Sequence, residues 1–167
     1  MREMIEGLTL FAYAAEAAEW DNRPHLRRVK AYAFTLLCSL GLPAAEAEML
    51  ALACTLHDVG KAATPDELLK RQGSYTAAEW QVMERHTIEG EKMLRESASP
   101  ILRAGAAIAL THHERWDGSG YPNHIAGEDI PLSGRVCALV DVFDALTTAR
   151  LYKEPIEIEE AFELIRR

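Results

Sequence analysis

The sequence predicts an all-α protein that folds as a single domain over residues 1–167. Three observations support this prediction. Apolar residues recur at spacings of three and four along most of the chain, without convincing strand-like alternation. Glycines, prolines and a capping motif divide these stretches into helix-length segments. The length, with 49% hydrophobic and 26% charged residues, suits one globular domain.

The helices are predicted from their start and stop signals. Pro24 is a good first-turn residue, and Gly41 is a stop signal for the helix that follows it. Thr76 and Glu79 form a Thr-x-x-Glu capping box, which predicts a helix beginning at residue 77. Helices are expected at residues 3–20, 24–40, 44–57, 77–97, 100–112, 133–147 and 157–167.

Residues 114–132 are expected to form an ordered loop. Five glycines and prolines make this stretch too irregular for any regular element: Gly118, Gly120, Pro122, Gly127 and Pro131. The last predicted helix is still running at the end of the sequence. We therefore expect the chain to be a piece of a longer protein or domain.

Composition limits where the protein acts. No run of roughly 18 apolar residues is present, so no membrane span is expected. The early apolar stretch lacks the basic flank and cleavage site of a signal peptide, which favours a cytoplasmic location. Cys38, Cys54 and Cys137 are far apart and lie among apolar residues, so we interpret all three as buried small hydrophobes.

The formal net charge of −8 bears on the binding partners. It argues against a nucleic acid polymer, which normally requires a basic face. It also looks unfavourable for a substrate that carries phosphate. That conflict disappears if many of the acidic residues surround metal ions, because two divalent cations would reverse the local sign of charge.

Five of the six histidines suggest a metal centre: His25, His57, His86, His112 and His113. Consecutive residues on a helix point about 100° apart, so adjacent pairs converge on one point most easily at a helix end. Both His57-Asp58 and His112-His113 lie near predicted helix ends. Imidazole with carboxylate suits iron, manganese or zinc, and the absence of thiolates disfavours structural zinc. A lone histidine is more often a surface or core residue, and His124 is interpreted as a loop residue.

Three long motifs follow one another along the chain. The first is His57-Asp58-x-Gly60-Lys61, continuing through Pro65-Asp66 to Glu79. The second is His112-His113-Glu114-Arg115-Trp116-Asp117-Gly118-Ser119-Gly120-Tyr121-Pro122, and the third is Asp141-Val142-Phe143-Asp144-Ala145-Leu146-Thr147 with Arg150 and Lys153 after it. Together they resemble the HD-GYP family, a group of metal-dependent phosphohydrolases in the HD superfamily. The resemblance implies an HD-type helical bundle with an ordered GYP loop, and hydrolysis of cyclic di-GMP.

The resemblance also implies a ligand set. One metal would be held by the residues that match the family's first site, namely His25, His57, Asp58 and Asp141. A second would be held by His86, His112 and His113, with the Asp58 carboxylate bridging both. Two divalent cations are implied, most naturally iron or manganese. Some members bind a third metal, for which the matching residue here is Asp21, although Asp21 could instead cap the helix at Pro24.

Five further residues match positions that contact substrate in the family. Lys61 matches a lysine thought to contact the scissile phosphate, so Asp58 and Lys61 are the expected catalytic residues. Tyr121 is expected to line the pocket, and Asp144, Arg150 and Lys153 match positions implicated in holding the dinucleotide. The structural alternatives are a solvated cation for Lys61 or Arg150, and an exposed or capping carboxylate for Asp144.

Besides Asp21, which stands where the members with a third metal have a glutamate, the sequence departs from the family at two further positions. Leu151 replaces a proline that usually follows the arginine, and His124 replaces a common loop glycine, which could require a positive φ from a non-glycine residue. These departures put only the local backbone and the pocket rim in doubt.

The expected chemistry is attack on phosphorus by a hydroxide that bridges two cations about 3.5–4 Å apart. The product would be the linear dinucleotide pGpG, with GMP as a further product. Two alternatives remain: a catalytically weak module that binds a cyclic dinucleotide or a partner protein, and a hydrolase of another cyclic dinucleotide. A regulatory or sensory domain and a homodimer are the expected partners beyond the substrate.

Overall fold

The computed structural model describes residues 7, 10–14, 23–149 and 154–166. Within these ranges every regular element is a helix, which confirms the all-α prediction. The α-helices are α2 (Arg23–Ser39), α3 (Ala44–Cys54), α4 (Asp66–Leu69), α5 (Ala77–Glu84), α6 (His86–Leu94), α7 (Pro100–Thr111), α8 (Leu132–Thr147) and α9 (Ile158–Ile165). Two short 3-10 helices are η1 (Val59–Ala63) and η2 (Gly127–Asp129).

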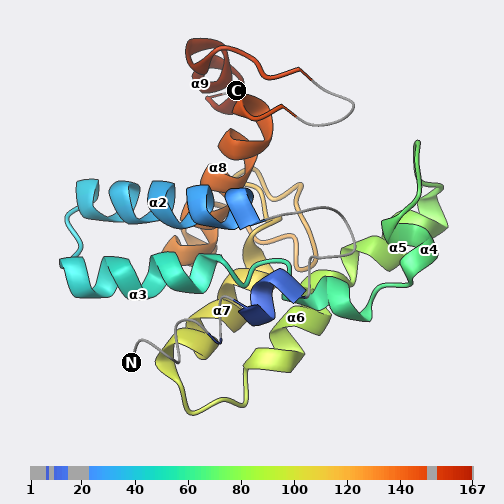
Figure 1. Ribbon diagram of the computed structural model, residues 1–167, viewed down its shortest axis with the longest axis horizontal. Coiled ribbons are helices and arrows are strands. Elements are labelled where there is room, and N and C mark those ends of the chain that lie inside the picture. The colour runs from blue at the N-terminus through green and yellow to red at the C-terminus, as the bar shows by residue number, and fades with distance from the viewer. Residues whose placement is uncertain (1–6, 8–9, 15–22, 150–153, 167) are drawn as a thin grey trace.

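The helices form a bundle of antiparallel pairs. Figure 1 shows α2 and α3 as one hairpin, with α8 crossing it and α6 and α7 lying below. Helices α4 and α5 project at one end of the molecule, whereas α9 packs on α8 at another. None of the helices in the described ranges is both long and apolar enough to cross a membrane.

Two apolar clusters hold the bundle together. The larger joins α2, α3, α7 and α8 through residues that include Val29, Leu37, Ala51, Ile108 and Cys137. The smaller joins the segment after α3 to neighbouring helices through Leu26, Leu56, Val59, Leu94 and Ala106. Leu56 and Val59 are each 1% exposed and flank residues 57 and 58. Core packing therefore fixes the backbone on both sides of the first motif.

Several helix boundaries differ from those predicted. The helix expected at residues 44–57 ends at Cys54, because the side chains of Thr55 and His57 hydrogen-bond the carbonyls of Leu52 and Cys54. The helix expected at 77–97 is instead two helices, α5 and α6, separated at Arg85. Local side-chain bonds again accompany this break, since Thr87 Oγ1 donates to the carbonyl of Glu84 at 2.8 Å.

The predictions for the capping box, the loop, the cysteines and the first helix have different outcomes. The capping box is present, with Thr76 and Glu79 each bonding the other's backbone N–H. The GYP loop, residues 114–132, contains the short helix η2, although no regular element was expected there, and η1 and α4 were also missed. Cys38 is only half-buried, contrary to prediction, while Cys54 and Cys137 are buried. Of the helix expected at 3–20, residues 7 and 10–14 are helical and the rest lie outside the described residues.

Candidate metal centre

The seven described residues predicted as metal ligands come from five separate segments. His25 lies in the first turns of α2, and His57 and Asp58 follow the end of α3. His86 begins α6, while His112 and His113 follow the end of α7 and Asp141 lies within α8. Both adjacent pairs therefore lie just past helix ends, as their spacing predicted.

The structure brings these residues together as two clusters. One contains Asp58, His86, His112 and His113, and the other contains His25, His57 and Asp141. Within each cluster the ligand-type atoms lie within 4.8 Å of one another. The division is the one implied by the resemblance, with Asp58 placed beside both groups. Asp21 lies outside the described residues, so its ligation of a third metal stays a prediction.

Asp58 is the point at which the two clusters meet. Its Oδ1 atom lies 3.3 Å from His86 Nε2, and its Oδ2 atom lies 3.2 Å from His57 Nε2. Burial alone would raise the pKa of this carboxyl, but Lys61 and His57 outweigh that effect and lower the pKa well below its usual range. Asp58 is therefore a carboxylate at neutral pH, with one oxygen directed to each cluster.

Three histidines are oriented by backbone carbonyls. The Nδ1 atoms of His57, His86 and His112 lie 2.9, 2.6 and 3.0 Å from the carbonyl oxygens of Cys54, Met83 and Ala109. A carbonyl oxygen only accepts, so each Nδ1 must carry a proton, and in its neutral form each ring presents the Nε2 lone pair to the cluster.

These lone pairs face one another at short range. His86 Nε2 and His112 Nε2 are 3.5 Å apart, and both rings donate through Nδ1 elsewhere. Two lone pairs and a carboxylate converging on one point repel each other unless a cation lies between them. Imidazole and carboxylate are also the donors preferred by divalent iron, manganese and zinc, so the residues present fit a metal ion.

Burial keeps two of these histidines neutral. It lowers the pKa of His112, and it lowers that of His113 to about 2. Metal binding requires the unprotonated imidazole. Both rings are thus in the ligand form throughout the physiological pH range.

The substrate-contact predictions have different outcomes. Lys61 Nζ lies 2.8 Å from Asp58 Oδ2, within the centre itself. Tyr121 stacks on His113 with ring centroids 4.8 Å apart, beside the second cluster. Burial raises the pKa of Tyr121, so its phenol remains protonated and can donate a hydrogen bond. Arg150 and Lys153 lie outside the described residues.

Asp144 has partners that the sequence did not suggest. Its side chain is buried at 1% exposure and is neither an exposed nor a capping carboxylate. His25 Nδ1 lies 2.8 Å from Oδ2, and Arg28 Nε lies 2.5 Å from Oδ1. Burial opposes ionisation of Asp144, but these hydrogen bonds outweigh it and lower the pKa to about 2.

Two residues near the centre were missed from the sequence. Arg28 lies three residues after His25, and that spacing on one helix face was a usable signal. Trp80 is 45% exposed, and its ring centroid lies 6.3 Å from that of Tyr121. No short-range signal could have linked Trp80 to Tyr121, because the two belong to different motifs.

The GYP loop is held in place by buried and backbone contacts. Glu114 is 5% exposed and accepts from the Asn123 backbone N–H at 2.7 Å. A Cβ added at Gly120 would lie 2.4 Å from the carbonyl oxygen of His113, so only glycine allows this approach. His124 has a φ of 56°, which is the positive value that replacement of a loop glycine suggested. The loop thereby places Tyr121 against His113.

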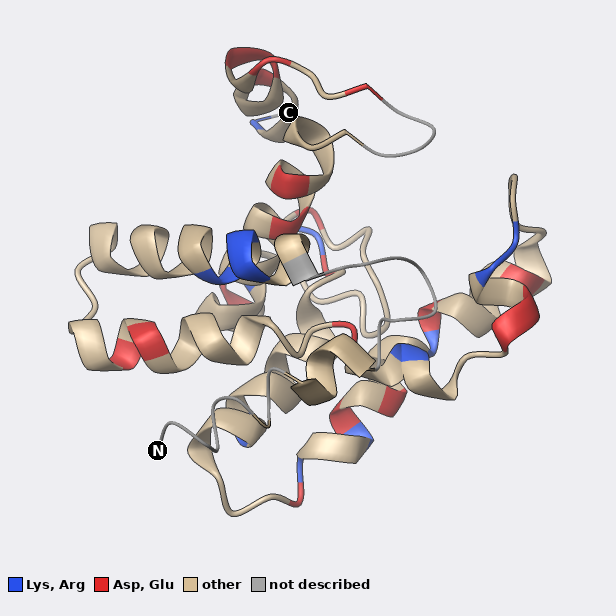
Figure 2. Cartoon of the chain, in the orientation of Figure 1, with Lys and Arg blue, Asp and Glu red and all other residues tan. Residues whose placement is uncertain are grey.

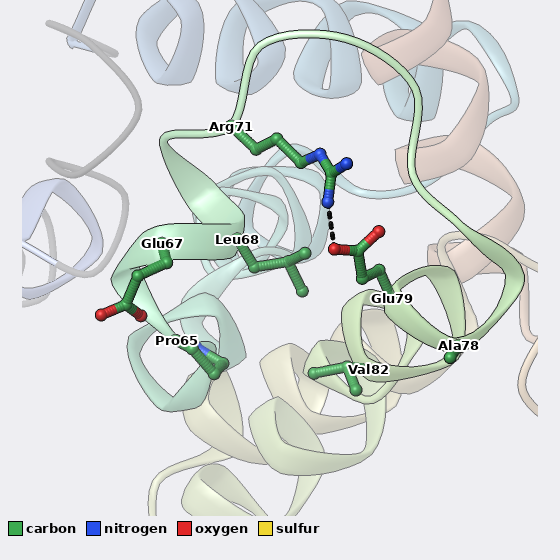
Figure 3. Close-up of a pocket in the computed structure, with 7 residues that line it drawn as sticks. All are labelled: Pro65, Glu67, Leu68, Arg71, Ala78, Glu79 and Val82. Carbon is green, nitrogen blue, oxygen red and sulfur yellow. Dashed lines mark hydrogen bonds and ion pairs between the residues drawn. The ribbon is translucent and has the colours of Figure 1, made fainter.

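A cavity of about 510 Å³ lies between α4 and α5 (Figure 3). Its walls include Leu68 and Val82, and an ion pair joins Arg71 to Glu79 across it. A second cavity of about 400 Å³ shares Pro65 and Val82 with the first and reaches His86. The second cavity is therefore lined in part by a residue of the second cluster.

Imidazoles outnumber carboxylates in the two clusters of the described residues. Within the described part of the chain, Asp58 and Asp141 are the acidic members of the two clusters. Figure 2 shows other Asp and Glu residues spread over α3, α4, α6 and α9. Five imidazoles and these two carboxylates thus make up the clusters, and bound cations would offset the charge of Asp58 and Asp141.

The chain is similar to several curated proteins over most of its length. The chain is 45% identical to 3'3'-cGAMP-specific phosphodiesterase 2 of Vibrio cholerae, over 97% of this chain and 30% of that protein. It is 40% identical to a cyclic di-GMP phosphodiesterase of Thermotoga maritima, over 97% of this chain and 44% of that protein. A cyclic di-GMP phosphodiesterase response regulator of Xanthomonas campestris is 42% identical, over 93% of this chain and 41% of that protein. The chain thus spans less than half the length of these relatives.

The fold also matches a solved structure. A Bdellovibrio bacteriovorus protein described as an HDG"Y"P protein superimposes with a TM-score of 0.60 and 22% identity, over 73% of this chain and 40% of that chain. At this identity the match shows the fold alone, and it confirms the expected HD-type helical bundle. The family described as HD domain matches residues 14–167. The resemblance noted in the motifs is confirmed, and the chain belongs to the HD domain family.

Proposed function

We propose that this chain is a metal-dependent phosphodiesterase domain that hydrolyses cyclic di-GMP to pGpG, with GMP as a further product. The observation that carries the proposal is the position of Asp58, whose two oxygens lie 3.3 and 3.2 Å from histidines of different clusters. Relatives named as cyclic dinucleotide phosphodiesterases support the substrate class. A bridging carboxylate between two imidazole groups is suited to phosphoester hydrolysis.

The proposed ligands are those of the two clusters. His25, His57, Asp58 and Asp141 would hold one cation, and Asp58, His86, His112 and His113 would hold the other. When bound, two iron or manganese ions would supply a nucleophilic hydroxide near neutral pH and offset the charge that builds on phosphorus. Lys61, beside Asp58, would direct a positive charge at a non-bridging phosphate oxygen.

An aromatic row supports binding of a purine base. Tyr121 stacks on His113, Trp80 meets Tyr121 edge to face, and Tyr75 lies 6.0 Å from Trp80. Base stacking on aromatic side chains contributes about 1–3 kcal/mol per base. We propose that Trp80, which leaves almost half of its surface exposed, receives a base of the dinucleotide while Tyr121 faces the reacting phosphate.

The second candidate substrate is a mixed cyclic dinucleotide. It is favoured by the relative from Vibrio cholerae that is named as specific for 3'3'-cGAMP and is 45% identical to this chain. The metal centre acts on the phosphodiester, so the chemistry would be unchanged. Turnover of the two substrates, compared on the same preparation, would separate the candidates.

The proposed partner, besides the substrate, is a regulatory or sensory domain. The curated relatives extend well beyond the part that this chain matches, which accounts for 30% to 44% of their length. Such additional sequence supports control of the hydrolytic domain by a neighbouring unit.

The proposal is tested by product analysis with the manganese-loaded chain and cyclic di-GMP. Asp58→Asn keeps the side-chain shape but removes the bridging charge, so we expect turnover to fall by more than about 100-fold. Asp66→Asn is the matched control, because Asp66 is an exposed carboxylate on α4 paired with Lys70. Its turnover should equal that of the wild type.

Two results would overturn the proposal. Undiminished turnover by Asp58→Asn would remove the role of the bridging carboxylate. Cyclic di-GMP that binds the fully loaded wild-type chain and stays uncut would instead identify a binding module.

A further inference from the structure

Asp144 is engaged on both oxygens by residues of α2. Oδ2 accepts from His25 Nδ1 at 2.8 Å and from Arg28 Nη2 at 3.0 Å, while Oδ1 accepts from Arg28 Nε at 2.5 Å. The carboxylate is 1% exposed. A dinucleotide could reach it only by displacing this bidentate guanidinium, which is among the stronger pairings available to a carboxylate. Direct substrate contact is therefore a poor role for Asp144.

The contact with His25 differs in kind from those of the other oriented histidines. His57, His86 and His112 direct Nδ1 to backbone carbonyls, which are neutral. His25 directs Nδ1 to a carboxylate. A carboxylate accepts only, so Nδ1 carries the proton and Nε2 is left to face Asp141 Oδ1, 3.6 Å away. A charged partner also makes the imidazole a more basic ligand than a carbonyl partner does.

We propose that Asp144 and Arg28 are positioning residues for the cluster of His25, His57 and Asp141. Asp144 fixes the proton of His25 on Nδ1 and so directs Nε2 at the metal, and Arg28 holds the carboxylate in that orientation. The inference rests on the proposed metal centre. It replaces the dinucleotide contact that the sequence resemblance suggested for Asp144.

The proposal predicts that the two clusters respond differently to loss of these residues. Among the described residues, Asp144 bonds His25 of one cluster, and Arg28 acts on that cluster through Asp144. The other cluster takes its orientation from the carbonyls of Met83 and Ala109, on α5 and α7. Removing the Asp144 charge should therefore weaken one of two metal sites and leave the second unchanged.

The experiment is titration of the metal-free chain with Mn²⁺, with the free ion followed by its electron paramagnetic resonance signal. The wild type should bind two ions per chain. Asp144→Asn keeps the shape of the side chain, and we expect about 10- to 100-fold weaker binding of one ion and unchanged binding of the other. Arg28→Lys keeps the charge but loses the bidentate geometry, so it should give a smaller loss at the same site.

Arg27→Gln is the matched control for Arg28→Gln. Arg27 is the exposed neighbour on the same helix. The Arg27→Gln chain should therefore bind both ions as the wild type does. Arg28→Gln should weaken one ion only. If Arg28 only stabilised the packing of α2 on α8, Arg28→Gln would lower the free energy of unfolding without altering either metal affinity. That result would overturn the proposal.

The remaining outcomes are equally decisive. If Asp144→Asn bound both Mn²⁺ ions as tightly as the wild type but had a raised KM for cyclic di-GMP, Asp144 would be a substrate contact instead. A wild-type chain that binds fewer than two ions would also overturn the inference. The proposed function fails separately, when the wild type binds two ions and leaves cyclic di-GMP uncut.

Discussion

At the scale of single residues, histidine identity matters less than what holds each ring. His86 and His112 are rotated by carbonyl acceptors so that their Nε2 atoms face each other at 3.5 Å. The sequence indicated which histidines take part, because His57, His112 and His113 lie in long motifs, and the family resemblance matched His25 and His86 to ligand positions. It could not reveal the partner of His25, because Asp144 is 119 positions away and its position within the third motif suggested another role.

Trp80 gives the prediction that belongs to this scale. Trp80→Ala should remove a stacking surface worth about 1–3 kcal/mol per base, which corresponds to a KM for cyclic di-GMP raised by about 5- to 150-fold. The metal ligands are untouched, so kcat should stay within about two-fold of the wild type.

The control is Trp116→Ala, because Trp116 is 64% exposed and its described ring contact is with Arg135. Steady-state kinetics of both variants provide the measurement. An unchanged KM in Trp80→Ala would show that the base lies elsewhere, and a lowered kcat with unchanged KM would place Trp80 in the chemical step.

At the scale of elements, the centre depends on close contact between η1 and α6. A Cβ built on Gly60 would lie 1.9 Å from the carbonyl oxygen of His86 and 2.4 Å from the backbone nitrogen of Gly90. The absence of a side chain at residue 60 therefore lets two backbones touch, and this brings Asp58 beside His86. The motif showed that a glycine follows the histidine and aspartate, but the surface that it meets depends on residues almost thirty positions later.

Gly60→Ala should accordingly damage both stability and metal binding. The added methyl group meets backbone atoms that cannot rotate away, so η1 must shift from α6, and overpacking of this kind costs about 1–3 kcal/mol or more. Urea unfolding of the metal-free variant should show this loss. Mn²⁺ titration should show weakened binding at the cluster that contains His86.

Ala62→Ser is the control within the same short helix, because Ala62 is exposed and should tolerate the change. A Gly60→Ala chain as stable as the wild type would mean that η1 moves freely relative to α6, and the close contact would then not position Asp58.

Helix boundaries show where local sequence patterns stop being informative. The capping box at Thr76 was readable because both partners lie within four residues. The break at Arg85 was not, because the apolar spacing continues across it and the competing side-chain bonds are made by ordinary residues such as Thr87. The helical class, the order of the helices and the helix end near His57 were therefore predictable, whereas the break before His86 was not.

At the scale of the whole molecule, the seven ligand-type residues link segments from α2 to α8. Loops, apolar contacts and polar contacts such as those of Asp144 with α2 hold these segments in the metal-free chain, and the repulsion between converging lone pairs acts against them. Bound cations would join the segments through direct bonds. A ligand that binds only the folded state at 100 times its Kd stabilises that state by about 2.7 kcal/mol per site.

Removal of metal should therefore lower the melting temperature markedly. A free energy of about 1 kcal/mol shifts Tm by about 2–4 °C in a domain of this size, so two sites predict a fall of about 10–20 °C on chelation. Differential scanning calorimetry of the manganese-loaded chain, with and without EDTA, measures it. Asp58→Asn should lose most of the shift because Asp58 serves both clusters, while Asp66→Asn should keep all of it. A fall in Tm of half this size would indicate that a single cluster holds metal under these conditions. A Tm that EDTA leaves unchanged would show that neither cluster does.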